Sequence, residues 1–314
     1  MLVLSRRSSI RLLSGVLGFV AIGFTAFEPS AFGQVKQATA LESRTSRTAT
    51  FLPTRPQSST AESQPDKVAT GHPLAAIIDY ARSEQKYLAQ TLRDFSCRLV
   101  KRERINGFVQ EMTYIDMNVR EEVLDGDQTV QPLSIFLRFL GPSKIAGRTA
   151  LFIEGQNDNK ILVRNGGRHF DYVVVKVDPN SDTDKEETLV PITEIGFNRL
   201  LDKMIDVLER HQKADPTGAN TKVERVAGAK MNHRPCTVIR VTHPAHMPGL
   251  EFHIANVFVD DELHAPVRVD YSDWAKSPGG KLPLIAEYTY TNLKLNVELP
   301  DAAFSRAQLR SAAE

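Results

Sequence analysis

The sequence predicts an α+β fold: a large, strongly curved antiparallel sheet, an open half-barrel, with two amphipathic helices on its concave apolar face. Apolar and polar residues alternate between Phe95 and Asp178, and turn residues interrupt the alternation, as in consecutive β-strands. More alternating segments follow between residues 221 and 299, and two longer segments carry apolar residues at helical spacing. Strands joined by short turns pair antiparallel, because a parallel crossover needs about a dozen residues. Sheets of this size curl.

Residues 1–33 predict a secretory signal peptide. Three arginines precede an apolar run from Leu12 to Phe27, and small residues, Ala31 and Gly33, stand where a signal peptidase reads the chain. We place the cleavage after Gly33. The run is shorter than the roughly 20 residues of a bilayer span, so we expect no stable transmembrane segment after processing. An uncleaved membrane anchor is the alternative. The expected location is periplasmic or extracellular.

The mature chain is expected to begin with a disordered tether. Residues 34–72 are rich in Ser, Thr, Gln, Ala and Pro, a composition that buries too little apolar surface to offset its ordering entropy. One curved-sheet domain is expected over residues 73–305, followed by a C-terminal tail over 306–314. The formal net charge of the whole chain is +1, which gives no electrostatic footprint for nucleic acid.

Two segments predict amphipathic helices, over about 73–92 and 196–212. Each has one apolar stripe, which includes Ile77 in the first helix and Leu201 in the second. A single stripe means that each helix must cover another layer. We expect both stripes to face the sheet.

The predicted strands fall on either side of the second helix. Asn106-Gly107, a strong hairpin signal, joins the first two strands. In the last strand the apolar phase changes, which predicts a bulge near Asn292. In chain order the strands are 95–105, 108–122, 132–140, 149–154, 160–164 and 168–178, then 221–228, 234–243, 250–260, 265–274 and 284–299.

Alternation assigns a set of apolar side chains to the concave face of the sheet, where the two helices would cover them. Such a face is either a close-packed core or the wall of a pocket. The candidates for a ligand cavity are Ile115, Met117, Ile135, Leu137, Phe139, Val269 and Tyr288 on strands, with Ile77 and Leu201 on the helices.

The strands with the clearest alternation also carry a family resemblance. The phrases CRLVKRERINGFVQE and PLSIFLRFLGPSKIAGRTALFIEGQNDNKILVRNGG, from Cys97 to Gly167, resemble the domain-of-unknown-function 1571 family of exported bacterial proteins. The resemblance covers roughly residues 74–304. It implies export, but no catalytic or binding residue, because none is established for the family.

At fold level the pattern is also similar to the periplasmic lipoprotein carriers of the outer-membrane lipoprotein-sorting type. Those proteins have a curved antiparallel sheet whose apolar inner face is plugged by helices, and the segment from Pro300 to Phe304 is similar to their usual close. This resemblance implies a lipid or other apolar ligand on the concave face. It is an analogy of fold, and fold alone does not fix function.

Cys97 and Cys236 are the only cysteines of the chain. In an oxidising compartment two cysteines predict a disulfide, with two buried free thiols as the alternative.

Histidines gather between His233 and His264, and His243 and His246 stand three residues apart. Paired imidazoles with a third ligand can hold zinc, so these two are weak metal candidates. Their segment is rich in proline and has no intervening glutamate, which favours surface loop histidines.

Three hypotheses of function remain. The first is a non-enzymatic carrier or sensor that binds a lipid or another apolar small molecule and needs no cofactor. The second is a structural or interaction module with a self-filled core and an envelope protein as partner. The third is a zinc-dependent hydrolase built on the region from His233 to His264.

Overall fold

The computed structural model describes residues 71–166, 173–181 and 188–311. All of them belong to one compact unit, Ser59–Glu314. The predicted signal peptide and almost all of the predicted tether lie outside the described residues, as does the first part of the predicted strand 168–178.

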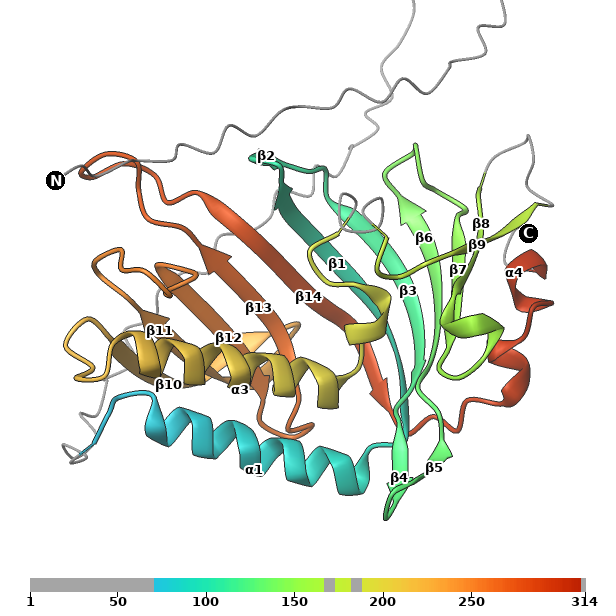
Figure 1. The fold of residues 1–314 in the computed structure, drawn as a ribbon, viewed down its shortest axis with the longest axis horizontal. Coiled ribbons are helices and arrows are strands. Elements are labelled where there is room, and N and C mark those ends of the chain that lie inside the picture. The colour runs from blue at the N-terminus through green and yellow to red at the C-terminus, as the bar shows by residue number, and fades with distance from the viewer. Residues whose placement is uncertain (1–70, 167–172, 182–187, 312–314) are drawn as a thin grey trace, which may run out of the picture. The chain divides into compact units, whose positions relative to one another are not determined.

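The core of the unit is a 12-stranded open sheet (Figure 1), with strand order β10-β11-β12-β13-β14-β1-β3-β6-β7-β8-β9 and β2 paired to β1. Neighbouring strands pair antiparallel, which confirms the predicted α+β fold with one large antiparallel sheet. The strands are β1 (Asp94–Ile105), β2 (Phe108–Val109), β3 (Thr113–Arg120), β6 (Ser134–Gly141), β7 (Thr149–Ile153), β8 (Ile161–Arg164), β9 (Val174–Val177), β10 (Lys222–Met231), β11 (Arg234–Thr242), β12 (Ile254–Asp260), β13 (Pro266–Ser272) and β14 (Leu284–Leu295).

The first long strand lies in the middle of the sheet, because β1 pairs with β3 on one side and with the last strand, β14, on the other. In the β1–β14 pair, Ser96 faces Lys294 and Arg98 faces Thr291, so β14 has one extra residue there. Asn292 has a positive φ of 53° at this point. The predicted bulge is confirmed.

Between β1 and β6 the chain differs from the prediction. The segment expected as one strand over 108–122 divides into β2 and β3, and an unpredicted hairpin of β4 (Val123–Asp125) and β5 (Gln128–Gln131) follows. Gly126, with a φ of 58°, makes the tight turn of this hairpin.

Two long helices lie on the same face of the sheet (Figure 1). They are α1 (Ala75–Thr91) and α3 (Phe197–Ala214), they contact each other, and their bounds agree with the predicted helices. The buried side of α3 repeats every three or four residues, as a helix covering a core requires. In the described part of the chain, no helix has the length and the apolar character that crossing a bilayer requires.

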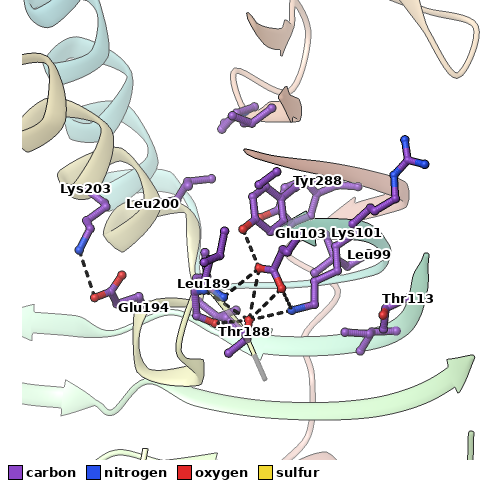
Figure 2. A pocket seen from close by; sticks show the side chains of 18 of the residues that line it. Leu99, Lys101, Glu103, Thr113, Thr188, Leu189, Glu194, Leu200, Lys203 and Tyr288 are labelled. Atoms are coloured by element: carbon purple, nitrogen blue, oxygen red, sulfur yellow. Dashed lines mark hydrogen bonds and ion pairs between the residues drawn. The ribbon is translucent and has the colours of Figure 1, made fainter. Parts of the chain in front are cut away.

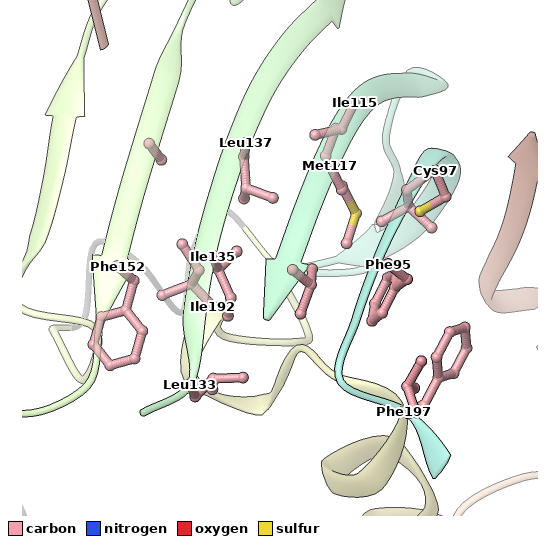
Figure 3. Packing of buried hydrophobic residues seen from close by; sticks show 14 of the residues in the cluster. Phe95, Cys97, Ile115, Met117, Leu133, Ile135, Leu137, Phe152, Ile192 and Phe197 are labelled. Carbon is pink, nitrogen blue, oxygen red and sulfur yellow. The ribbon is translucent and has the colours of Figure 1, made fainter. Parts of the chain in front are cut away.

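A large cluster of buried side chains lies where the end of α1 and the start of α3 meet β1, β3, β6 and β7. Figure 3 shows part of it. Phe95 and Phe197 stack with ring centroids 4.7 Å apart. Ile135 and Leu133 are 0% exposed. Each such side chain contributes about 1.5–3 kcal/mol by leaving water.

The folded part continues beyond residue 305, where the sequence placed the end of the domain. The short helices η3 (Asp301–Phe304) and α4 (Gln308–Ser311) pack against β6, β7 and β8, and Leu309 is 0% exposed. Thr149 donates a hydrogen bond of 3.1 Å to the carbonyl of Leu309. A sequence pattern of only four residues was too short to predict this contact.

Candidate ligand cavity

A cavity of about 860 Å³ lies between the sheet and the two helices. This volume is in the range of small-molecule sites, roughly 300–1,000 Å³. The structure places nearly all the predicted candidates on its wall: Ile115, Met117, Leu137, Phe139, Val269 and Tyr288 from strands, with Ile77 and Leu201 from helices.

Ile135 is the candidate that the structure does not place on the wall. It lies two residues before Leu137 on the same face of β6, but it is fully buried in the packed cluster of Figure 3. The concave face is therefore divided: one end is close-packed, and the other encloses space.

The wall is mainly aliphatic and aromatic. Helix α3 covers it with Leu200, Leu201 and Met204, and β14 contributes Tyr288 and Tyr290. Burial raises the pKa of Tyr290 well above its usual value, so this phenol stays neutral. The wall is thus suited to a ligand that is largely apolar.

The wall also carries charged side chains, among them the Lys203–Glu194 pair, and the most buried of its polar groups gather around Glu103 (Figure 2). The Glu103 carboxylate accepts hydrogen bonds from the Tyr288 hydroxyl at 2.7 Å and from the Leu189 N–H at 3.2 Å. Lys101 Nζ donates to Glu103 Oε2 and to Thr188 Oγ1, both at 2.7 Å. We call Lys101, Glu103, Thr188 and Tyr288 the polar cluster.

The sequence contained a signal for this cluster that the prediction missed. On β1 the inward phase runs through Phe95, Cys97 and Leu99, and the same phase continues to Lys101 and Glu103. Both charged side chains therefore point to the concave face. Their exposed fractions are only 14% and 3%.

A buried carboxylate fixes the start of the covering helix. Glu121, the residue after β3, accepts a hydrogen bond of 2.6 Å from the N–H of Phe197, the first residue of α3. The backbone N–H of Glu121 donates to the carbonyl oxygen of Arg93. A carboxylate there also interacts favourably with the helix dipole. Burial nevertheless raises the pKa of Glu121 to about 7, although Arg199 and the helix donors oppose the shift.

A histidine pair fixes the other end of α3. His211 Nδ1 lies 2.9 Å from His243 Nε2, and both rings are 0% exposed. The N–H of Glu251 donates to His211 Nε2, so the proton of His211 is on Nδ1 and points to His243. Burial and the nearby His243 lower the pKa of His211 to about 4.

This arrangement leaves neither ring a free lone pair for a metal. The lone pair of His211 accepts from Glu251, and that of His243 accepts from His211. His246 packs against Trp274 instead, with ring centroids 4.7 Å apart. Within the described residues, no group of three or more His, Cys, Asp or Glu side chains is arranged to hold a metal ion.

The predicted Cys97–Cys236 disulfide is not formed; both cysteines are buried free thiols. Cys97 is on β1 and Cys236 is on β11, with β12, β13 and β14 between them, a separation of roughly 19 Å along the sheet. Ile239 lines the cavity, and Cys236, three residues earlier on β11, points to the opposite face of the sheet. Cys97, by contrast, points to the cavity side. Burial raises the pKa of Cys97 to about 12.

A family model for a protein of unknown function (DUF1571) matches residues 92–310, which contain all the strands of the sheet. The chain belongs to this family. The resemblance noted in the sequence is thereby confirmed. No curated protein gives a significant match to this DUF1571 protein.

Three solved structures illustrate the similarity in fold. A DUF1329 family protein from Desulfovibrio piger is 14% identical, with 76% of this chain and 99% of that chain covered and a TM-score of 0.37. A putative outer membrane lipoprotein-sorting protein domain from Vibrio parahaemolyticus is 9% identical, with 74% and 97% covered and a TM-score of 0.35. A LolA superfamily protein from Nitrosomonas europaea is 9% identical, with 73% and 98% covered and a TM-score of 0.33. At these identities the likeness concerns the fold alone.

Proposed function

We propose that this DUF1571 protein is an exported, non-enzymatic carrier or sensor that holds a lipid or another apolar ligand between its sheet and its two long helices. The observation that supports it most is the apolar cavity of about 860 Å³. Export is proposed from residues 1–33, whose arginines, apolar run and small residues have the pattern of a signal peptide.

The arrangement of the helices also supports binding. Helix α3 covers the wall with an apolar stripe, and both of its ends are fixed by buried polar groups, Glu121 and the His211–His243 pair. These contacts hold the cover in place while the space beneath it stays available. The energy of binding would come from apolar surface removed from water, about 25 cal/mol per Å².

Native mass spectrometry of the full-length chain tests the proposal, provided that the protein is purified without detergent so that a bound lipid is retained. The expected spectrum contains protein with a co-purified lipid, and a neutral fluorescent probe such as Nile red should bind in the emptied cavity. Protein free of lipid that also fails to bind the probe would contradict it. That outcome would favour the structural or interaction module instead.

A further inference from the structure

The polar cluster lies on the mainly apolar wall of the cavity, and its members differ in how many of their hydrogen-bonding groups already have a partner. Glu103 already accepts hydrogen bonds from Lys101, Tyr288 and the Leu189 N–H, and the Thr188 hydroxyl lies 3.3 Å from both of its oxygens. Burial, and after it the nearby Glu103 carboxylate, raises the pKa of Tyr288 far above its usual value. The hydroxyl of Tyr288 therefore stays protonated and remains a donor.

Lys101 is the member of the polar cluster that has an unused hydrogen-bond donor. An ammonium group has three N–H donors, and two of them are used, by Glu103 and Thr188. Lys101 lines the cavity, and its side chain is 14% exposed. Its third N–H is thus available to an acceptor on a bound molecule.

The charge of the cluster decides which acceptor fits. The positive charge of Lys101 is balanced by Glu103 at 2.7 Å, so the polar cluster is neutral. An ionised carboxylate placed beside Lys101 would bring a second negative charge into apolar surroundings without a counter-ion, which is costly. A neutral carbonyl accepts the same hydrogen bond and adds no charge.

The other cationic side chains of the wall have partners of their own and do not supply that missing counter-ion. Arg102 pairs with Glu287 at 2.7 Å, and Arg148 also interacts with a partner. Lys203 pairs with Glu194 at 3.3 Å, and Lys144 lies 3.9 Å from Glu111. Both lysine side chains are more than half exposed, so water screens them.

We infer that Lys101 donates its third hydrogen bond to the neutral carbonyl of an acyl ester or amide, so that the cavity selects esterified acyl chains over free fatty acids. The inference rests on the proposed function, because it needs a ligand in the cavity. It adds to that function one ligand-binding residue, Lys101, and the chemical class of the ligand, a long apolar chain that ends in an uncharged acyl carbonyl.

Displacement of Nile red from the full-length chain at pH 8 tests the inference with three competitors of similar chain length, each below its aggregation concentration. They are methyl oleate, with a neutral carbonyl, ionised oleate, and 1-octadecene, with no polar group. The wild type should bind methyl oleate about tenfold more tightly than the other two, the gain expected of one hydrogen bond from a charged donor.

Variants of the cluster separate charge from hydrogen bonding. Glu103→Gln leaves Lys101 without its counter-ion, and so should reverse the preference and favour oleate. The double variant Lys101→Met with Glu103→Gln removes the donor and stays neutral, and so should bind methyl oleate no better than 1-octadecene. Lys86→Met, at an exposed lysine of α1 that does not line the cavity, is the control and should keep the preference of the wild type.

The outcomes distinguish the two proposals. If the wild type binds neither probe nor competitor, the proposed function fails and the inference with it. If it binds all three competitors equally, the carrier proposal stands and the inference is overturned. Equal preference in the wild type and in Glu103→Gln would also overturn it. The comparison of the three competitors on the wild type decides the selectivity even where a variant does not fold.

Discussion

Glu121 is a residue whose ionisation should be coupled to the stability of the fold. Its pKa is raised from 4.5 to about 7 by burial, so the folded state binds a proton more tightly than the unfolded state does. The stability that it contributes is therefore present at low pH and is lost as the pH rises from about 4.5 through about 7. A shift of this size corresponds to about 3 kcal/mol.

Replacing Glu121 by Gln should remove this dependence, because the amide oxygen still accepts from Phe197 but does not ionise. The expected result is that the free energy of unfolding of Glu121→Gln, relative to the wild type, rises by up to about 3 kcal/mol between pH 4.5 and pH 8. Urea denaturation at a series of pH values measures it. A pH dependence that is the same in the variant and in the wild type would contradict the assignment to Glu121.

His211 should act in the opposite direction. Its pKa is lowered from 6.5 to about 4, so the unfolded state takes up the proton first when the pH falls. The stability from neutral His211 is complete above about pH 6.5 and is lost as the pH falls toward 4. The loss amounts to about 3 kcal/mol.

His211→Phe keeps a ring beside Phe252, whose centroid lies 4.8 Å from that of His211, but it removes the titration. At pH 7 this variant should be less stable by about 1–3 kcal/mol, because the Glu251 N–H and His243 lose their partner. Between pH 6.5 and pH 4 it should lose less stability than the wild type. An equal acid loss in both proteins, measured by urea denaturation, would show that His211 is not the coupled group.

At the scale of the element, the start of α3 depends on Gly196. This residue has a φ of 128°, a backbone conformation that side chains disfavour, and an added Cβ would lie 3.0 Å from Glu121 Oε2. Gly196→Ala should therefore destabilise the protein by about 1–3 kcal/mol and loosen the hydrogen bond to Phe197. Thermal unfolding measures the loss, and hydrogen exchange of the Phe197 amide measures the loosening.

Gly126 provides the matched control for Gly196. Its φ is also positive, at 58°, but nothing lies within 4 Å of an added Cβ. Gly126→Ala should cost about 1 kcal/mol, the backbone penalty alone. If both variants cost the same and the Phe197 amide stays protected, the contact between Gly196 and Glu121 does not position α3.

The elements themselves were predictable because their signals are local. Period-two alternation located the long strands, and the apolar stripes located α1 and α3 within two residues. The pairing of β1 with β14 could not be predicted in this way, since residues 95 and 295 are neighbours only through the order of all the strands. The same order separates Cys97 from Cys236, which is why the expected disulfide was wrong.

The candidate site was predictable to the same extent. Alternation placed Leu137 and Tyr288 on the concave face, but it could not show that Ile135 is packed while Leu137 borders open space. The polar partners were missed for a different reason: Thr188 belongs to a segment without periodicity, and His211 meets His243 only through tertiary packing. Such contacts have no signature in a single sequence.

At the scale of the whole folded unit, the question is whether the space beneath the helices admits a ligand or is filled by the protein's own side chains. β6 offers a matched pair of positions, because Ile135 and Leu137 share one face two residues apart. Both side chains belong to one buried cluster, but Leu137 borders the cavity and is 5% exposed, whereas Ile135 does not border it and is 0% exposed. A charge introduced at Leu137 would lie beside the cavity, which water can enter, whereas a charge at Ile135 would have only packed side chains around it.

Leu137→Glu should therefore fold, since water in the cavity can hydrate the carboxylate, but it should bind Nile red or methyl oleate at least about tenfold more weakly. Ile135→Glu should not fold at pH 8, because it buries an unpaired charge among close-packed side chains, a loss well above about 4 kcal/mol. Circular dichroism and probe titration measure the two properties separately. If both variants unfold and the wild type takes up no probe, the sheet and helices enclose a filled core, and the chain is an interaction module whose partners meet its outer surface.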